Sequence, residues 1–377
     1  MPPLTVLETI SEARRLVIKI GSALLVDDEA GGLRSSWLTS VVDDIAALKS
    51  SGVDVIVVSS GAVAMGLSSM GFTTRPSRLE DAQAAAAVGQ IRLAQAYQSR
   101  FERHNMITAQ VLLTLEDMED RPRYLNARNT INALAEKGAV PVINENDTVA
   151  TQELRFGDND RLAARVAHMV GADALILLSD IDGLFDSDPH VNTDATFFEV
   201  VKDITPEIEA MAGPCPISTP GSGGMITKVA AAKIALAGGC SMIIANGTHD
   251  HPIQRLQNGG RATLFPATST PLAVKKRWIR GMMAPKGQLR LDAGAMNALK
   301  KGASLLPAGV THAEGDFDRG DLVEIYSQDG GLVAQGLASY NANDTAQIIG
   351  HKSADVSAIL GYAGRAALVH RDDMVML

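Results

Sequence analysis

The sequence has few cysteines: Cys215 and Cys240 are the only two among 377 residues. They lie far apart and form no CxxC motif, so they predict neither a disulfide framework nor a zinc site. This usage suits a reducing compartment, and we therefore expect a cytoplasmic protein.

Long apolar runs and metal-binding patterns are also missing. No uncharged apolar run reaches the roughly 18 residues that a membrane-spanning helix requires. The N-terminal segment carries Glu8 and Glu12 and lacks the apolar stretch of a secretory signal peptide. The eight histidines show no metal-ligand spacing such as HExxH. We expect no membrane association and no metal site built from protein ligands alone.

Positive charge is in deficit, with 34 lysines and arginines against 43 aspartates and glutamates and a net charge of −9. A chain with this charge is a poor candidate for binding nucleic acid by bulk attraction. Hydrophobic residues make up 46% of the sequence, which indicates a globular protein. Its length allows one large domain or two ordinary ones.

Short apolar runs alternate with longer amphipathic segments from residue 15 to about residue 265. Most runs are apolar at nearly every position, which is typical of strands buried on both faces. The helix-like segments between them include 35–52, which begins with serines able to cap it, and 78–105. This order predicts an α/β fold with a mostly parallel sheet and helices on both sides. The predicted strands are 16–20, 54–60, 107–113, 139–143, 172–178 and 241–245.

The pattern changes after Pro266. The basic stretch 275–281 is interpreted as a linker or boundary strand, and short runs split by turn signals follow it. These runs are typical of antiparallel β structure, and they predict a small second domain rich in β-strands. The expected divisions are an N-terminal extension (1–14), a first domain (15–270), a linker (271–285), a second domain (286–364) and a C-terminal tail (365–377).

Four of the predicted strands end in glycine, hydroxyl, amide or carboxylate residues. Parallel sheets bind ligands at the carboxyl ends of their strands. One such end is ordinary loop chemistry, but four at one edge indicate a binding site. The residues are Gly21 and Ser22, Ser60 to Ala62, Asn144 to Asp147, and Ser179 and Asp180.

Two lysines are candidates for contacts with phosphate. Lys19 interrupts an apolar strand just before Gly21, where a glycine lets a phosphate approach backbone N–H groups. A lysine that snorkels from an edge strand is the alternative. Lys228 falls in the first turns of a helix after the glycine-rich segment 220–224, a natural anion site. The alternative is a solvated lysine beside a flexible loop.

Asp160 also has two interpretations. It precedes a helical pattern within the sequence GDND, where a carboxylate can cap the helix. A carboxylate between two lysines could instead hold and position both of them. The sequence alone leaves both interpretations open.

Five segments together resemble one known family. They are VIKIGSALL (17–25), VVSSGAVAMG (57–66), VINENDTVA (142–150), FGDND (156–160) and SGGMITK (222–228). In this order they closely resemble the amino acid kinase family, in particular its branch that phosphorylates glutamate. The resemblance covers nearly the whole chain. LLPAGVTHAEGDFDRGDLVEIY (305–326) looks like a PUA domain, the RNA-binding module of several RNA-modifying enzymes.

The resemblance implies a three-layer α/β/α sandwich and ATP-dependent phosphorylation of the γ-carboxylate of L-glutamate, the first step of proline biosynthesis. Mg²⁺ would accompany the ATP, and proline would inhibit at or near the glutamate site. We also expect a homo-oligomer, with glutamyl phosphate reductase as a functional partner.

The resemblance also assigns residues to roles. Lys19 and Lys228 match positions that contact the transferring phosphoryl group, and Asp160 matches the position that organises them. The positions that match glutamate-binding residues are Ser60, Asp147 and Asn159. The positions that match ATP-binding residues are Lys19, Gly21, Ser22, Ser179, Asp180, Ser222, Gly223, Gly224, Met225, Ile226, Thr227 and Lys228.

Two rival functions remain at this stage. Another acid kinase of the same fold, such as aspartokinase or acetylglutamate kinase, is disfavoured by the NENDTVA segment and the appended domain. An RNA-binding protein is the rival from another class. Residues 286–377 contain 8 lysines and arginines and 11 aspartates and glutamates, a net charge of −3. An acidic domain is a poor match for a polyanion, so a structural or regulatory role is the preferred hypothesis.

Overall fold

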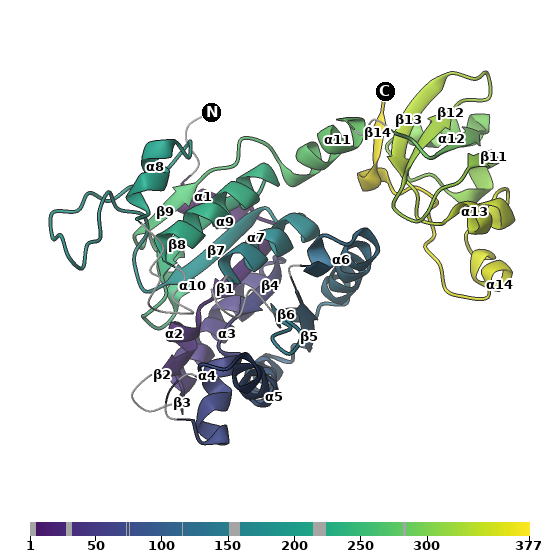
Figure 1. Ribbon diagram of the computed structural model, residues 1–377. Coiled ribbons are helices and arrows are strands. Elements are labelled where there is room, and N and C mark those ends of the chain that lie inside the picture. Colours follow the sequence, from purple (N-terminus) through teal and green to yellow (C-terminus); the bar gives the residue numbers. More distant parts are fainter. Residues whose placement is uncertain are drawn as a thin grey trace. The chain divides into compact units, whose positions relative to one another are not determined.

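The computed structural model divides the chain into two compact units, Met1–Pro271 and Leu272–Leu377 (Figure 1). The structure describes residues 5–27, 32–72, 74, 76–114, 116–150, 159–213, 224–281 and 284–377. Each unit has its own hydrophobic core. In the part of the chain that the structure describes, no helix is both long and apolar enough to cross a membrane.

The first unit is built on a seven-stranded sheet with the order β5-β6-β4-β1-β7-β8-β9. Its pairs are parallel except for β8 with β9, which is antiparallel. All six predicted strands are confirmed, and β9 adds a seventh at one edge. The bounds are β1 (Arg15–Ile20), β4 (Asp54–Ser59), β5 (Thr108–Leu113), β6 (Val140–Glu145), β7 (Ala174–Ser179), β8 (Ser241–Asn246) and β9 (Ala262–Phe265).

Helices cover both faces of this sheet, so the predicted three-layer α/β/α arrangement is confirmed (Figure 1). One face packs chiefly against α3 (Ser35–Ser50) and α5 (Leu79–Phe101), and the other against α7 (Asn159–Val170) and α9 (Met225–Ala237). The remaining helices are α1 (Val6–Glu12), α2 (Ser22–Leu25), α4 (Ala62–Leu67), α6 (Arg121–Glu136), α8 (Pro206–Met211) and α10 (Pro252–Gln257). The short strands β2 (Val26–Asp27) and β3 (Gly32–Leu33) pair with each other antiparallel.

Two local expectations were wrong. The serines expected to cap α3 lie inside its first turn, and the helix starts after Arg34 without a side-chain cap. The edge-strand alternative for Lys19 fails because β1 lies in the middle of the sheet, where Lys19 pairs with Val58 of β4 and Leu177 of β7. A lysine at this position has no solvent edge to which it could snorkel.

The alternation of side chains along β1 decides which face Lys19 meets. Leu16, Ile18 and Ile20 belong to the core against α3, whereas Val17 belongs to the core against α7 and α9. Because successive side chains of a strand point to opposite faces, Lys19 shares the face of Val17. The ammonium group of Lys19 therefore lies on the face of the sheet that α7 and α9 cover.

The second unit contains a five-stranded sheet with the order β11-β10-β12-β13-β14. The pair β10–β12 is parallel, and the others are antiparallel, which confirms the predicted β-rich texture. The strands are β10 (Gly287–Leu291), β11 (Val310–Gly315), β12 (Leu322–Tyr326), β13 (Leu332–Leu337) and β14 (Met374–Met376). The helices are α11 (Pro271–Gly281), α12 (Ala293–Lys300), α13 (Ala342–Ile348) and α14 (Val356–Leu360).

The ends of the second unit differ from the sequence-based divisions. The basic stretch 275–281 lies in helix α11, not in a strand, and it packs on the sheet through the fully buried Ile279. Residues 365–377 are not a separate tail, because β14 pairs with β13 and Val369 lies in the core. Both segments complete the second unit.

A close crossing of α4 and α5 yields the first prediction. A Cβ atom on Gly89 would lie 1.8 Å from the carbonyl oxygen of Ala62. We expect Gly89→Ala to lower the free energy of unfolding by about 1–3 kcal/mol through overpacking, although alanine favours helices. Chemical denaturation measures this change.

Gly281→Ala is the matched control, because nothing lies within 4 Å of a Cβ at the end of α11. It should leave the stability nearly unchanged. Equal stability of Gly89→Ala and the unmodified chain would contradict the close helix crossing.

Candidate active site

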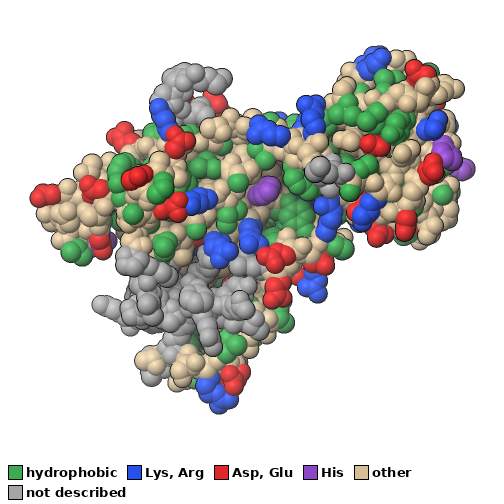
Figure 2. Space-filling view, turned by 45° about the horizontal axis from the view of Figure 1, so that its top comes forward, with side chains coloured by type: hydrophobic (Ala, Val, Ile, Leu, Met, Phe, Trp, Pro, Cys, Tyr) green, Lys and Arg blue, Asp and Glu red, His purple; other side chains and the backbone are tan. Residues whose placement is uncertain are grey.

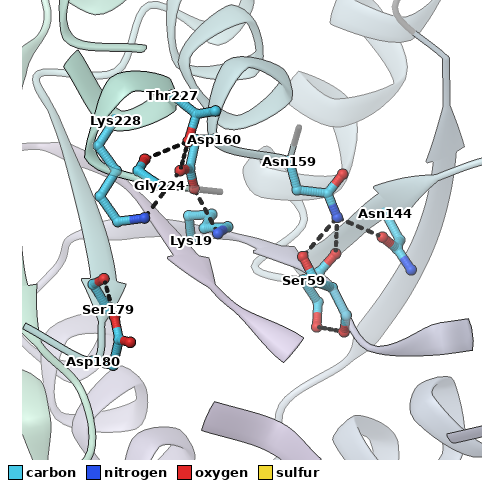
Figure 3. Close-up of polar contacts among 11 residues, drawn as sticks. Lys19, Ser59, Asn144, Asn159, Asp160, Ser179, Asp180, Gly224, Thr227 and Lys228 are labelled. Carbon is cyan, nitrogen blue, oxygen red and sulfur yellow. Dashed lines mark hydrogen bonds and ion pairs between the residues drawn. The ribbon is translucent and has the colours of Figure 1, made fainter. Parts of the chain in front are cut away.

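A buried carboxylate lies between two lysines near the carboxyl end of β1 (Figure 3). Asp160 forms ion pairs with both lysines. Its Oδ1 lies 2.5 Å from Lys19 Nζ, and its Oδ2 lies 3.3 Å from Lys228 Nζ. The residues come from α7, β1 and α9, and their exposed fractions are 1%, 8% and 7% in that order. The structure thus brings the three predicted catalytic residues together.

The electrostatics of this triad favour an ionised Asp160. Burial would raise the pKa of its carboxyl group, but the charges of Lys19 and Lys228 and the hydrogen bonds from Lys19 and Thr227 outweigh burial. They hold the pKa of Asp160 well below its usual range. One carboxylate opposed to two ammonium groups leaves a surplus positive charge, so the triad can attract an anion.

The first turn of α9 adjoins the triad. Thr227 Oγ1 lies 2.9 Å from Asp160 Oδ2 and 2.9 Å from the carbonyl oxygen of Gly224, and its single proton can serve either oxygen. Gly224, Met225 and Ile226 form the start of this helix, where free N–H groups and the helix dipole favour anions. Four of the predicted ATP-binding residues are thus placed beside the two lysines. Ser222 and Gly223 lie outside the described residues.

These contacts decide between the interpretations of Asp160 and Lys228. The Asp160 carboxylate is engaged by two ammonium groups and the Thr227 hydroxyl, as expected for the bridging interpretation rather than capping alone. Lys228 is buried within α9, so the solvated-lysine alternative is wrong.

A second group of polar side chains surrounds Asn159, the residue before Asp160 (Figure 3). Its Nδ2 lies 2.7 Å from Ser60 Oγ, 3.2 Å from the carbonyl oxygen of Ser59 and 3.3 Å from Asn144 Oδ1. Asn144 Nδ2 in turn donates to Gln90 Oε1 at 2.7 Å. The ends of β4 and β6, the start of α7 and the middle of α5 meet in this network, which we call the amide cluster (Asn159, Ser60, Asn144 and Gln90).

Asp147 lies in the turn that follows β6 and is half-buried. Because β6 is the neighbour of β4, this turn shares the edge of the sheet at which Ser60 lies. The two predicted substrate-binding residues thus follow adjacent strands.

The remaining predicted ATP-binding residues follow β1 and its neighbour β7. Gly21 precedes α2, which begins at Ser22, and a Cβ on Gly21 would lie 3.7 Å from Lys19 Nζ. Ser179 ends β7, and its hydroxyl donates to Asp180 Oδ1 at 3.0 Å. Gly21 therefore leaves open space next to the Lys19 ammonium, and Asp180 is exposed at the same edge of the sheet.

Comparisons with known proteins identify the family. A family model described as the amino acid kinase family matches residues 14–246, and one described as a PUA domain matches residues 287–360. The chain belongs to the amino acid kinase family. Relatives named glutamate 5-kinase are 55% identical in Agrobacterium fabrum and 56% identical in Rhizobium etli, each over 97% of this chain and 94% of that protein. The relative of that name in Paramagnetospirillum magneticum is 55% identical over 97% of this chain and 99% of its own length.

Sequence reasoning on this amino acid kinase misses part of the amide cluster. It places Asn144 at a polar strand end without a role, and it does not single out Gln90. The NEND sequence carries a signal for Asn144. No sequence signal marks Gln90, because it lies in an alanine-rich helix and is brought to Asn144 by tertiary packing.

The triad generates a prediction for stability. Asp160→Asn removes the carboxylate that both buried ammonium groups contact, so we expect a loss of about 3–5 kcal/mol in the free energy of unfolding at neutral pH. The folded-state pKa of Asp160 lies below its unfolded value. Its stabilising contribution is therefore fully present above about pH 4 and is lost as the pH falls through the folded-state pKa.

Denaturant titrations of both proteins at neutral and acid pH measure this difference. Thr227→Val is the control, because it removes one hydrogen bond to the same carboxylate and should cost only about 1 kcal/mol. A stability of Asp160→Asn equal to that of the control would show that the ion pairs contribute nothing.

Proposed function

We propose that the triad and the amide cluster are the two halves of the active site through which this chain, like the glutamate 5-kinases, makes L-glutamyl 5-phosphate from ATP and L-glutamate. The observation that carries the assignment is Asp160 bridging Lys19 and Lys228 next to the start of α9. The relatives above are named for glutamate, not for aspartate or acetylglutamate, which favours this substrate over its rivals.

The chemistry requires alignment and cations more than proton transfer. A glutamate γ-carboxyl group in water has a pKa of about 4.3, so it is ionised at neutral pH and needs no general base to become a nucleophile. The obstacle is the repulsion between this anion and the phosphate that it attacks. Lys19, Lys228 and the N–H groups at the start of α9 would neutralise that charge during transfer.

Asp160 would hold both ammonium groups in place before the substrates arrive. It engages each lysine through a different carboxylate oxygen, so one buried residue fixes two cations from separate elements. A site arranged in advance needs little reorganisation when charge develops in the transition state. The triad has two ammonium groups and one carboxylate, and this net positive charge would attract the phosphoryl group.

The amide cluster would bind the amino-acid end of glutamate. Ser60 and Asn159 offer hydrogen bonds to the substrate carboxylate, and Asp147 offers a charge-assisted bond to its ammonium group. Asn144 would orient the Asn159 amide through their hydrogen bond, and Gln90 would hold Asn144 in turn. Because Asn159 and Asp160 are consecutive, the acceptor would lie between this cluster and the lysines.

ATP would bind along Gly21, Ser22, Ser179, Asp180 and the start of α9. Mg²⁺ would be held chiefly by the nucleotide phosphates, which suits a site with few protein ligands. Among the described residues, no group of three or more histidines, cysteines, aspartates and glutamates could hold a metal ion. Cytoplasmic location, homo-oligomer formation, inhibition by proline and cooperation with glutamyl phosphate reductase stay predictions.

Hydroxylamine trapping tests the reaction itself. An acyl phosphate formed from glutamate and ATP should be trapped as the γ-hydroxamate, and proline should reduce its yield. A hydroxamate formed from aspartate or acetylglutamate in preference to glutamate would overturn the substrate assignment.

Lys228→Ala should lower kcat at least about 100-fold, because a charge contact to the transition state is lost. Lys233→Ala on the same helix is the matched control, since Lys233 is half-exposed and pairs with Glu209 away from the triad. Steady-state kinetics with saturating ATP and glutamate decide the outcome. Near-normal turnover of a folded Lys228→Ala variant would refute its role.

Asp147→Ala should mainly raise the KM for glutamate, because the substrate ammonium loses its carboxylate partner. Inhibition by glutarate, a diacid without an amino group, should respond little to the substitution. A change confined to the KM for ATP, or an equal loss of affinity for glutamate and glutarate, would contradict this placement.

A further inference from the structure

A basic cavity of about 580 Å³ lies within the second unit, and all of its lining residues belong to that unit. Four cationic side chains and one carboxylate line it: Lys276, Arg277, Arg280, Arg371 and Asp372. Apolar side chains, including those of Met374 and Met376, complete the lining. The volume is in the usual range of small-molecule sites.

One face of α11 supplies three of the four cations. Lys276, Arg277 and Arg280 share that face with Ala273, at helical spacings of three, four and seven residues from it. Residues with these spacings lie on the same side of a helix, so their charged ends converge on one space. The helix therefore presents a row of positive charges to the cavity.

The opposite side of α11 is anchored to the sheet of the same unit. Ile279 is fully buried against Leu322, Leu337 and Val375, and Lys275 forms an ion pair with Asp373. Arg280 donates to the carbonyl oxygen of Met376 at 3.2 Å. These contacts hold the cationic face of α11 beside the segment that carries Arg371.

The charge in the cavity is not balanced by its own lining. Among the described residues of the lining, Asp372 is the only acidic one, and its Oδ1 lies 3.8 Å from Arg371 Nε. Lys276 is exposed and makes no ion pair with a described residue. The described part of the lining thus carries more positive than negative charge, and such a site attracts an anion.

The net charge of −3 given for residues 286–377 leaves out the cations of α11. The stretch 272–285 adds four cations and no acidic residue, so the unit from 272 to 377 has a net charge of +1 instead of −3. Figure 2 shows both acidic and basic side chains on the visible face. The second unit as a whole is therefore not acidic.

Most of the lining also lies outside the two family models. The first model ends at residue 246 and the PUA model covers 287–360, whereas the cationic lining comes from 276–280 and Arg371. We propose that this cavity is a second anion-binding site that takes a small molecule bearing phosphate groups, separate from the site of phosphoryl transfer.

The cavity favours a small phosphate compound over a nucleic acid. An arginine guanidinium group can donate two parallel hydrogen bonds to two oxygens of one phosphate, and a lysine ammonium adds a compact positive charge. The apolar part of the lining can contact the body of such a molecule. A polynucleotide needs a basic track along its backbone, whereas this cavity offers a single small site lined by four cations.

Methyl NMR on the full chain with labelled methionines tests the proposal with pyrophosphate as the probe. Met374 and Met376 line the cavity, whereas Met225 begins α9 in the first unit, so one titration reports both places separately. At constant ionic strength, the methyl signals of Met374 and Met376 should shift and saturate. Lys276→Gln combined with Arg371→Gln should weaken this binding at least about tenfold, because two charge contacts are lost.

Lys301→Gln combined with Arg319→Gln is the matched control, since both residues are exposed in the same unit and outside the lining. It should leave the titration unchanged. Ala273→Glu is a second test that spares every cation: it adds a carboxylate to the exposed start of α11 and should also weaken binding.

Three outcomes would overturn the proposal. In the first, the Met374 and Met376 signals do not respond to pyrophosphate. In the second, they respond equally in the cavity variant and the control. In the third, they respond to an RNA oligonucleotide at concentrations where pyrophosphate has no effect. The Met225 response is independent of all three, so a failure here leaves the proposed kinase function untouched.

Discussion

The ion triad is the interaction on which the arrangement of the first unit depends. Asp160 is almost fully buried, and a carboxylate is tolerated there because two ammonium groups and a hydroxyl meet it. Those partners come from β1 and α9, which are more than 200 residues apart in sequence. Asp160 therefore serves both stability and the proposed chemistry. The contacts that make its burial tolerable also fix the positions of two ammonium groups.

The sheet makes this meeting possible through strand alternation. β1 lies between β4 and β7, so a side chain near its end can be surrounded by the ends of both neighbours. Lys19 faces the layer of α7 and α9 because Val17 does. A shift of one residue in β1 would turn the ammonium toward α3 and α5 and leave Asp160 with a single lysine.

Much of this fold was readable from the sequence, because strands buried on both faces leave continuous apolar runs. Residues 172–178 and 241–245 are examples, and both became inner strands. Helix α11 was not readable, since only Ile279 is buried and the basic residues around it resemble a linker. β14 was missed because a strand of three residues near the end of a chain carries almost no periodic signal.

In the site, too, the local sequence identifies single residues, whereas only the fold shows which of them are in contact. Lys19, Asp160 and Lys228 were found because charge stands out beside apolar or glycine-rich segments. Their mutual contacts, and the contact of Gln90 with Asn144, depend on long-range packing that no local pattern contains. Alternatives such as capping by Asp160 could be resolved only when its partners were known.

The two halves of the site are coupled because α7 contributes consecutive residues to them. Asn159 belongs to the amide cluster and Asp160 contacts the lysines, so a movement of the start of α7 changes both halves at once (Figure 3). Substitutions at Ser60 or Asn144 can alter the amide cluster while the triad stays intact. In the proposed site, the choice of acceptor would therefore change by substitution in the amide cluster, whereas the buried carboxylate fixes the position of the two lysines.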